Sequence, residues 1–210
     1  MAGYKLVGML DSPFVRRVAI ALELYELGYD NLPLRTVGDA AEFARYSPLK
    51  RAPSLVLEDG QVLVDSHMIL VHLDELVAPE RCLTPQAAAP RLACRQVVGV
   101  AAGLADKAVS AFYEKNFHAP EQRNARLLER NRGQLMDSLA WLEERAPSQF
   151  LLGNELCHAD IMVGTAVRFG RDAVPDLVDL APTPRVAAWF ERLESLAVFV
   201  KTYLAFDPPK

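Results

Sequence analysis

The first eighty residues mix two hydrophobic periods. Residues 6–10 are mostly apolar and predict a short strand, and from Pro13 onward apolar residues recur at helical spacing, which predicts a helix closed by Gly28. Five more elements are predicted in chain order: a strand over 31–37, a short helix over 39–46, two strands over 53–57 and 61–64, and a helix over 65–77. The turn residues Glu58-Asp59-Gly60 join the last two strands as a hairpin. This order predicts a mixed four-stranded sheet with one parallel crossover and one antiparallel hairpin.

After residue 78 only helical spacing remains. Prolines at positions 79, 85 and 90 punctuate a linker, which we assign to residues 79–87. Helices are predicted over 88–116, 120–145, 157–171, 183–195 and 197–205. The fold class is therefore α/β plus all-α, with a sheet-containing domain over 1–78 and an all-helical bundle domain over 88–210.

Composition and charge narrow the function classes. Hydrophobic residues make up 51% of the 210 residues, which is enough for a sizeable core, and the net charge of −4 without a basic stripe argues against a nucleic-acid partner. No run approaches the roughly 18 apolar residues of a membrane span, and no signal peptide is expected. Cys82, Cys94 and Cys157 form no Cys-x-x-Cys pair, so we expect a reducing, cytoplasmic setting with neither a disulfide framework nor a zinc site. His67 and His72 fall on different helix faces, and no metal site is expected.

The first candidate for chemistry is Ser12-Pro13. Serine before a helix and proline at its first position form a favourable helix start. The serine hydroxyl and the first free N–H groups of the helix then point at one spot, which suits an anion. The alternative is that Ser12 only caps the helix.

Two further polar loops lie where the predicted sheet meets a loop or helix. A cis Ala52-Pro53 bond would turn the backbone of Ala52 outward to pair with an extended peptide, whereas an ordinary trans proline would simply start a strand. Asp65-Ser66 offers a carboxylate beside a helix start, which suits the ammonium and carboxylate of an α-amino acid. Ser66 could instead merely cap its helix.

Together these segments resemble the glutathione transferase family over almost the whole chain. The motifs that carry the resemblance are Ser-Pro-Phe-Val-Arg-Arg-Val from residue 12, Ala-Pro-Ser-Leu from 52, Gln-Val-Leu-Val-Asp-Ser-His-Met-Ile-Leu from 61 and Gly-Asn-Glu-Leu-Cys-His-Ala-Asp-Ile from 153. They are similar to the serine-type active-site segment, the cis-proline, the γ-glutamyl-binding segment and the folding motif of the helical domain. The resemblance implies a thioredoxin-like first domain, glutathione as co-substrate, a detoxifying transfer to a small hydrophobic electrophile, and a homodimer.

The resemblance also implies roles for individual residues. Ser12 would hydrogen-bond the glutathione sulfur, and Ala52, before the cis-proline position Pro53, would pair its backbone with the cysteinyl part. Asp65 and Ser66 would hold the γ-glutamyl ammonium and carboxylate. Either Arg51 or its neighbour Lys50 would lie near the glycyl carboxylate.

The chain departs from the family pattern at the folding motif. Cys157 stands where Ser or Thr is usual, so the helix cap that it forms with Asp160 is expected to be weaker by roughly a kcal/mol. No cysteine occupies the Ser12 position, which argues against disulfide-exchange chemistry there. Phe14, Phe112 and Tyr113 are candidates for the electrophile pocket but are also ordinary core residues. Glutathione-dependent isomerisation, peroxide reduction or dehalogenation, and a non-catalytic ligand-binding role, stay open as alternatives.

Overall fold

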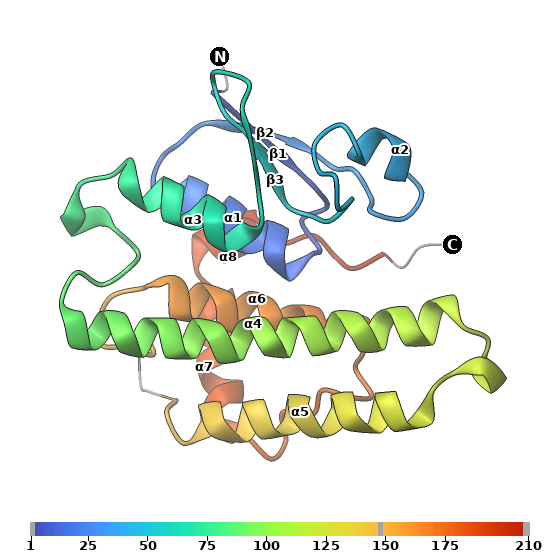
Figure 1. Cartoon of the computed structure of the whole chain (residues 1–210). Coiled ribbons are helices and arrows are strands. Elements are labelled where there is room, and N and C mark those ends of the chain that lie inside the picture. The colour runs from blue at the N-terminus through green and yellow to red at the C-terminus, as the bar shows by residue number, and fades with distance from the viewer. Residues whose placement is uncertain (1–2, 147–148, 208–210) are drawn as a thin grey trace. The chain divides into compact units, whose positions relative to one another are not determined.

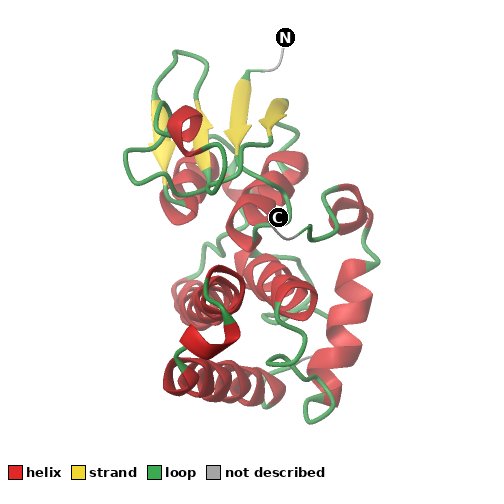
Figure 2. Ribbon diagram, turned by 90° about the vertical axis from the view of Figure 1, so that its right-hand side faces the viewer, coloured by secondary structure: helices red, strands yellow, loops and turns green. Residues whose placement is uncertain are grey.

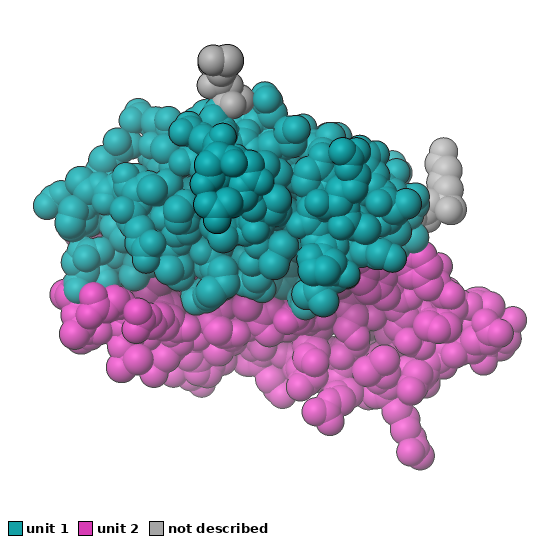
Figure 3. All heavy atoms as spheres, turned by 45° about the horizontal axis from the view of Figure 1, so that its top comes forward, with its two compact units in different colours: residues 1–86, 197–210 teal, residues 87–196 magenta. Residues whose placement is uncertain are grey.

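The chain divides into two compact units. A computed structural model describes residues 3–146 and 149–207 (Figure 1). Unit 1 comprises Met1–Gln86 and Ala197–Lys210, and unit 2 comprises Ala87–Leu196 (Figure 3).

Unit 1 contains the mixed four-stranded sheet expected from the sequence. Its strands are β1 (Tyr4–Val7), β2 (Tyr29–Leu32), β3 (Ser54–Val56) and β4 (Val62–Val64), in the spatial order β2-β1-β3-β4. β1 pairs with β2 in parallel, and the β1–β3 and β3–β4 pairs are antiparallel. The prediction of a strand over 31–37 was wrong in its bounds, because Pro33 has no N–H to donate to a ladder and the strand precedes it.

The helices of unit 1 before the linker are α1 (Pro13–Leu24), α2 (Ala40–Phe43) and α3 (Ser66–Glu75), followed by the 3₁₀ turn η1 (Pro79–Arg81). α1 ends earlier than predicted, and Gly28 is not its cap. Glu26 adopts a left-handed φ of 58°, the Leu27 N–H donates to Leu22 O at 2.9 Å and the Glu26 N–H to Glu23 O at 3.1 Å. This is a Schellman ending with glutamate where glycine is usual, which local sequence signals do not reveal.

The two faces of the sheet are covered by different helices. Neighbouring strand residues point to opposite faces, and Val7 on one face clusters with Leu34 and with Phe43 of α2. On the other face α1 and α3 pack side by side, with Leu6 and Ile69 fully buried (Figure 1). The sheet of unit 1 is therefore enclosed on both faces.

A segment distant in sequence completes unit 1. Its place in the sequence predicts that it belongs to the helical domain, but α8 (Ala197–Lys201) packs on α1. The buried Arg16 donates from Nη2 to Phe199 O at 2.7 Å, and its guanidinium lies 5.6 Å from the ring centre of Phe199 and 5.5 Å from that of Tyr203. Lys201 forms an ion pair with Glu23 at 2.6 Å. These long-range contacts explain why the described residues 197–207 group with the sheet.

The described part of unit 2 contains helices and no strand of the kind found in unit 1 (Figure 2). Its elements are α4 (Ala88–Phe117), the 3₁₀ turn η2 (Pro120–Gln122), α5 (Ala125–Glu143), α6 (His158–Ala173) and α7 (Pro184–Glu194). α4 packs most extensively on α6 and next on α5. α5 begins later than predicted, because Asn124 caps it by accepting from the Leu127 N–H at 3.0 Å.

The start of α6 is organised by the buried carboxylate of Asp160. It accepts from the backbone N–H of Leu151 at 2.7 Å, from the backbone N–H of Cys157 at 3.1 Å and from the Cys157 thiol at 3.3 Å. The thiol therefore donates to the carboxylate. Burial raises the pKa of Asp160 against the opposing effect of these hydrogen bonds.

Candidate active site

Three loops leave the sheet of unit 1 at the same end. Val7 pairs with Ser54, and Ser54 pairs with Val64, so these residues form one row across β1, β3 and β4. Because β3 is antiparallel to both neighbours, the chain leaves β1 and β4 at the end where it enters β3. The loops that contain residues 8–12, 50–53 and 65–66 therefore lie at the same end of the sheet.

Gly8 allows the first two of these loops to approach closely. Its φ is 132°, and a Cβ built on it would lie 2.7 Å from Val15 Cγ2 and 3.0 Å from Ala52 Cβ. No side chain fits that space without displacement, and the backbone conformation itself favours glycine. The Asn31 side-chain amide holds the turn by donating to the carbonyls of Leu6 and Gly8, each at 3.0 Å. Gly8 and Asn31 are not among the site residues predicted from the sequence, although a glycine directly after a strand is a signal for such an approach.

Ser12 is the N-cap residue of α1, as predicted, and Pro13 is its first helical residue. The backbone of Ser12 donates to Met9 O at 3.1 Å and accepts from the Arg16 N–H at 2.9 Å, but its side chain makes no capping hydrogen bond. The first turn of α1 contains no acidic residue. The half-buried hydroxyl is thus not used by the helix that it precedes.

A charged cluster lies beside Ser12. Burial raises the pKa of Asp11, while the Arg35 guanidinium opposes that effect. Arg35 donates to the backbone O and to Oδ2 of Asp207, both at 3.0 Å. No local pattern indicates this ion pair, because its two residues lie 172 positions apart.

The second loop contacts the start of α1. The Arg51 guanidinium lies 5.8 Å from the ring centre of Phe14, one residue after Pro13. Arg51 is exposed, and Lys50 before it has a left-handed φ of 52°. The Ala52–Pro53 peptide bond is cis, and Pro53 is buried.

The third loop positions Asp65 and Ser66 at the start of α3. Asp65 is the N-cap residue, with a φ of 72°, and its Oδ1 accepts from the His67 N–H at 2.8 Å. Non-glycine residues adopt such a φ at a cost, and Asp and Asn tolerate it best. Ser66 is the first helical residue and is buried, so the alternative in which Ser66 caps the helix was wrong.

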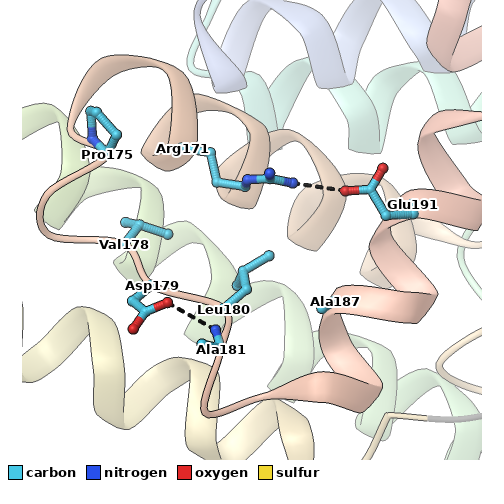
Figure 4. A pocket seen from close by; sticks show the side chains of 8 residues that line it. All are labelled: Arg171, Pro175, Val178, Asp179, Leu180, Ala181, Ala187 and Glu191. Atoms are coloured by element: carbon cyan, nitrogen blue, oxygen red, sulfur yellow. Dashed lines mark hydrogen bonds and ion pairs between the residues drawn. The ribbon is translucent and has the colours of Figure 1, made fainter.

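Other candidate features lie elsewhere. A hollow of about 440 Å³ in unit 2 contains none of the predicted site residues (Figure 4). An ion pair between Arg171 and Glu191 at 2.8 Å crosses one side of it. Its lining residues are Arg171, Pro175, Val178, Asp179, Leu180, Ala181, Ala187 and Glu191.

Phe112, Tyr113, Phe117 and Phe169 form an aromatic cluster in unit 2, with ring-centre distances of 5.4 to 6.4 Å. Over residues 3–146 and 149–207, no group of three or more His, Cys, Asp or Glu side chains is placed to hold a metal ion. Within the same residues, no helix combines the length and apolar character needed to cross a membrane.

Comparison with known proteins identifies relatives of the whole chain. The family model for the glutathione S-transferase N-terminal domain matches residues 6–81, and that for the C-terminal domain matches residues 125–192. The uncharacterized GST-like protein YibF of Escherichia coli K12 is 30% identical, over 98% of this chain and 99% of that protein.

Two solved structures are also similar. A glutathione S-transferase from Methylobacterium radiotolerans, in complex with glutathione sulfonate, superposes with a TM-score of 0.90 at 27% identity, covering 99% of this chain and 97% of that one. A glutathione transferase family member from Pseudomonas fluorescens Pf-5 with bound glutathione gives a TM-score of 0.85 at 28% identity, covering 95% and 98%.

Proposed function

This chain belongs to the glutathione S-transferase family, and from that premise we propose that it is a glutathione transferase in which Ser12 activates the thiol of bound glutathione. The observation that carries the proposal is the convergence of three polar loops at one end of the sheet. One loop offers a hydroxyl at a helix start, the next a backbone beside a cis proline, and the third a carboxylate beside a helix start. These are the groups that a thiol, a peptide backbone and an α-amino acid require.

The proposed role of Ser12 is to donate its hydroxyl proton to the sulfur. A free thiol has a pKa near 8.5, and lowering it to about 6.5 requires about 2.7 kcal/mol in favour of the thiolate. A hydrogen bond to a charged group supplies about 1.5–3 kcal/mol, and the N-terminus of α1 adds about 0.3–1 kcal/mol. Ser12 need not act as a base, since its own proton stays on oxygen.

The surroundings of Ser12 support this role. Its hydroxyl is not engaged in capping α1, and the first turn of that helix contains no acidic side chain to oppose an anion. The Arg35 guanidinium opposes the effect of burial on the pKa of the neighbouring Asp11, so a positive charge also acts on this end of the sheet. The thiolate would attack an electrophilic carbon, forming a sulfur–carbon bond as the leaving group departs with its electron pair.

The rest of the tripeptide would be held by the other two loops. We assign the γ-glutamyl ammonium to Asp65 and its carboxylate to Ser66 with the first N–H groups of α3. The backbone of Ala52, beside Pro53, would pair with the cysteinyl residue, and Arg51 would approach the glycyl carboxylate. The cation of Arg51 over the Phe14 ring supports a location near Ser12.

Three measurements test the proposed function: affinity retention, conjugation and calorimetry. We expect the protein to be retained on immobilised glutathione, to be eluted by free glutathione, and then to conjugate glutathione to a chloronitrobenzene. Retention without conjugation would contradict the transferase assignment and favour an isomerase, a peroxidase or a non-catalytic binding protein of this family. Absence of glutathione binding in calorimetry would contradict the site as a whole.

Family membership also supports three proposals about the domains, the oligomeric state and the cellular role. We propose a sheet-containing domain over 1–78, a linker over 79–87 and a helical domain from residue 88 whose last segment, from residue 197, groups with the sheet-containing unit. We also propose a homodimer and a detoxifying role in the cytoplasm. Light scattering on the purified protein tests the dimer, since a monomeric mass at micromolar concentration would contradict it.

A further inference from the structure

The hollow in unit 2 lies where the chain turns from α6 into α7. Arg171 lines it from the last turn of α6, and Ala187 and Glu191 line it from α7, where a spacing of four residues places them on one helix face. The connecting loop passes close to α6, because a Cβ built on Gly170 would lie 2.8 Å from Val178 Cγ2. The volume of about 440 Å³ falls in the range of small-molecule sites, roughly 300–1,000 Å³.

The loop between α6 and α7 gives the hollow an apolar wall. Val178 is buried and Leu180 is half-buried, and Figure 4 shows both side chains pointing into the hollow. Asp179, between them, accepts through Oδ1 from the Ala181 N–H at 2.9 Å, a turn of the kind that aspartate side chains form. The apolar wall is therefore shaped by contacts within the loop itself.

An ion pair at the edge of the hollow is open to solvent. Arg171 Nη1 lies 2.8 Å from Glu191 Oε1, and the two side chains are 39% and 65% exposed. The Arg171 guanidinium also lies 5.4 Å from the ring centre of Phe190, a second contact that orients it. Because an exposed ion pair contributes little to stability, both groups can bind charges of a ligand at little cost to the fold.

The charges around the hollow favour one class of ligand. Its lining contains one cation, Arg171, and two carboxylates, Asp179 and Glu191. A simple anion would meet the carboxylates, and a simple cation would meet the guanidinium. An α-amino acid has its carboxylate and its ammonium on the same carbon, so it can place one on each partner of the Arg171–Glu191 pair.

We propose that this hollow binds a zwitterionic α-amino acid with an apolar side chain. The carboxylate of the ligand accepts from Arg171, and its ammonium donates to Glu191. Its side chain packs against Val178, Leu180 and Ala187, which line the hollow. The inference is independent of the proposed transferase activity, because the hollow contains none of the predicted glutathione-binding residues.

The experiment titrates L-leucine into the full ¹⁵N-labelled chain in the presence of saturating glutathione. Glutathione is included because the site proposed for its γ-glutamyl end also suits an α-amino acid. We expect saturable binding in the millimolar range, with shifts of the amide signals of Leu180 and Ala187. Since these signals report on the hollow alone, they test the proposal even if the protein fails to bind glutathione. Absence of saturable shifts at these positions would overturn it.

Three leucine analogues test each contact on the unchanged chain. N-acetyl-L-leucine lacks the ammonium, L-leucinamide lacks the carboxylate, and glycine lacks the apolar side chain. Each should bind about 10-fold or more weakly than L-leucine, because each loses one charged or apolar contact. An analogue that bound as tightly as L-leucine would contradict the assigned ligand class.

Variants of the lining residues test the location. Arg171→Gln should weaken leucine binding about 10-fold or more, and Ala187→Trp, which fills the hollow, should abolish it. The matched control is Arg192→Gln, since Arg192 is an exposed arginine of α7 that does not line the hollow. The control should bind leucine as the parent does, and melting temperatures would verify that each variant is folded. Parent affinity in Arg171→Gln and Ala187→Trp, or an equal loss in Arg192→Gln, would refute the assignment to this hollow.

Discussion

Replacing Ser12 by alanine separates a catalytic role of the hydroxyl from a structural one. In the structure the helix start depends on the backbone of Ser12, which accepts from the Arg16 N–H at 2.9 Å, and not on its side chain. Removing the hydroxyl therefore leaves the contacts of α1 in place. We expect the free energy of unfolding to change by less than about 0.5 kcal/mol, as for a substitution that removes no structural interaction.

Asn124 provides the matched control, because its side chain does cap a helix. Its Oδ1 accepts from the Leu127 N–H at 3.0 Å, and Asn124→Ala is expected to cost about 0.5–2 kcal/mol of stability. It should leave conjugation unchanged. Urea unfolding should therefore show a loss of stability only for Asn124→Ala, and the conjugation assay should show a loss of activity only for Ser12→Ala.

The expected loss of activity follows from the hydrogen bond proposed for Ser12. Losing about 1.5–3 kcal/mol of thiolate stabilisation corresponds to a fall of about 10- to 100-fold in conjugation at neutral pH, with glutathione affinity changed only a few fold. The pKa of bound glutathione, followed by thiolate absorbance, should rise toward that of the free thiol. If Ser12→Ala retained the parent rate at neutral pH, the proposed activation would be refuted.

Three further predictions concern other residues of unit 1. Asp65→Asn keeps a side-chain oxygen that can accept from the His67 N–H, and asparagine tolerates the φ of 72°, so the variant should keep the parent melting temperature. It should bind glutathione about 10-fold or more weakly in calorimetry, and an affinity equal to that of the parent would remove Asp65 from the site. Burial raises the pKa of Asp11, so the stability that its protonated form contributes is present below pH ~4 and is lost as the pH rises through the folded-state pKa. Asp11→Asn should therefore resist urea unfolding better than the parent at pH 7, and this difference should vanish near pH ~3. Arg16→Met removes the donor to Phe199 O and should lower the free energy of unfolding by about 1.5–3 kcal/mol, whereas an unchanged urea midpoint would show that this contact does not hold the segment.

Local signals predicted the features that neighbouring residues determine. Ser12-Pro13 marked the start of α1, and the turn at 58–60 marked an antiparallel hairpin, because capping and tight turns depend on residues adjacent in sequence. The end of α1 was missed because Glu26 adopts a conformation usually reserved for glycine. For the site, the sequence predicted the three polar loops at the end of the sheet. It did not predict that Gly8, by lacking a Cβ, lets two of these loops approach each other.

Long-range contacts account for the remaining differences between the predicted and the observed fold. The position of residues 197–207 on α1 depends on Arg16, which reads in sequence as one more polar residue of a surface helix yet is 2% exposed. This packing could not be inferred from hydrophobic periodicity, which reports the face of an element and not its partner.

The discontinuity of unit 1 has a consequence for biosynthesis. Arg16 and the carbonyl of Phe199 that it binds are 183 residues apart, and at roughly 5–20 residues per second a ribosome needs about 10–40 s to make the chain between them. During that interval the sheet can form, but the outer surface of α1 lacks its last layer. The amino-terminal unit therefore matures after translation of the helical unit, and a released fragment ending at residue 86 would expose apolar surface that chaperones recognise.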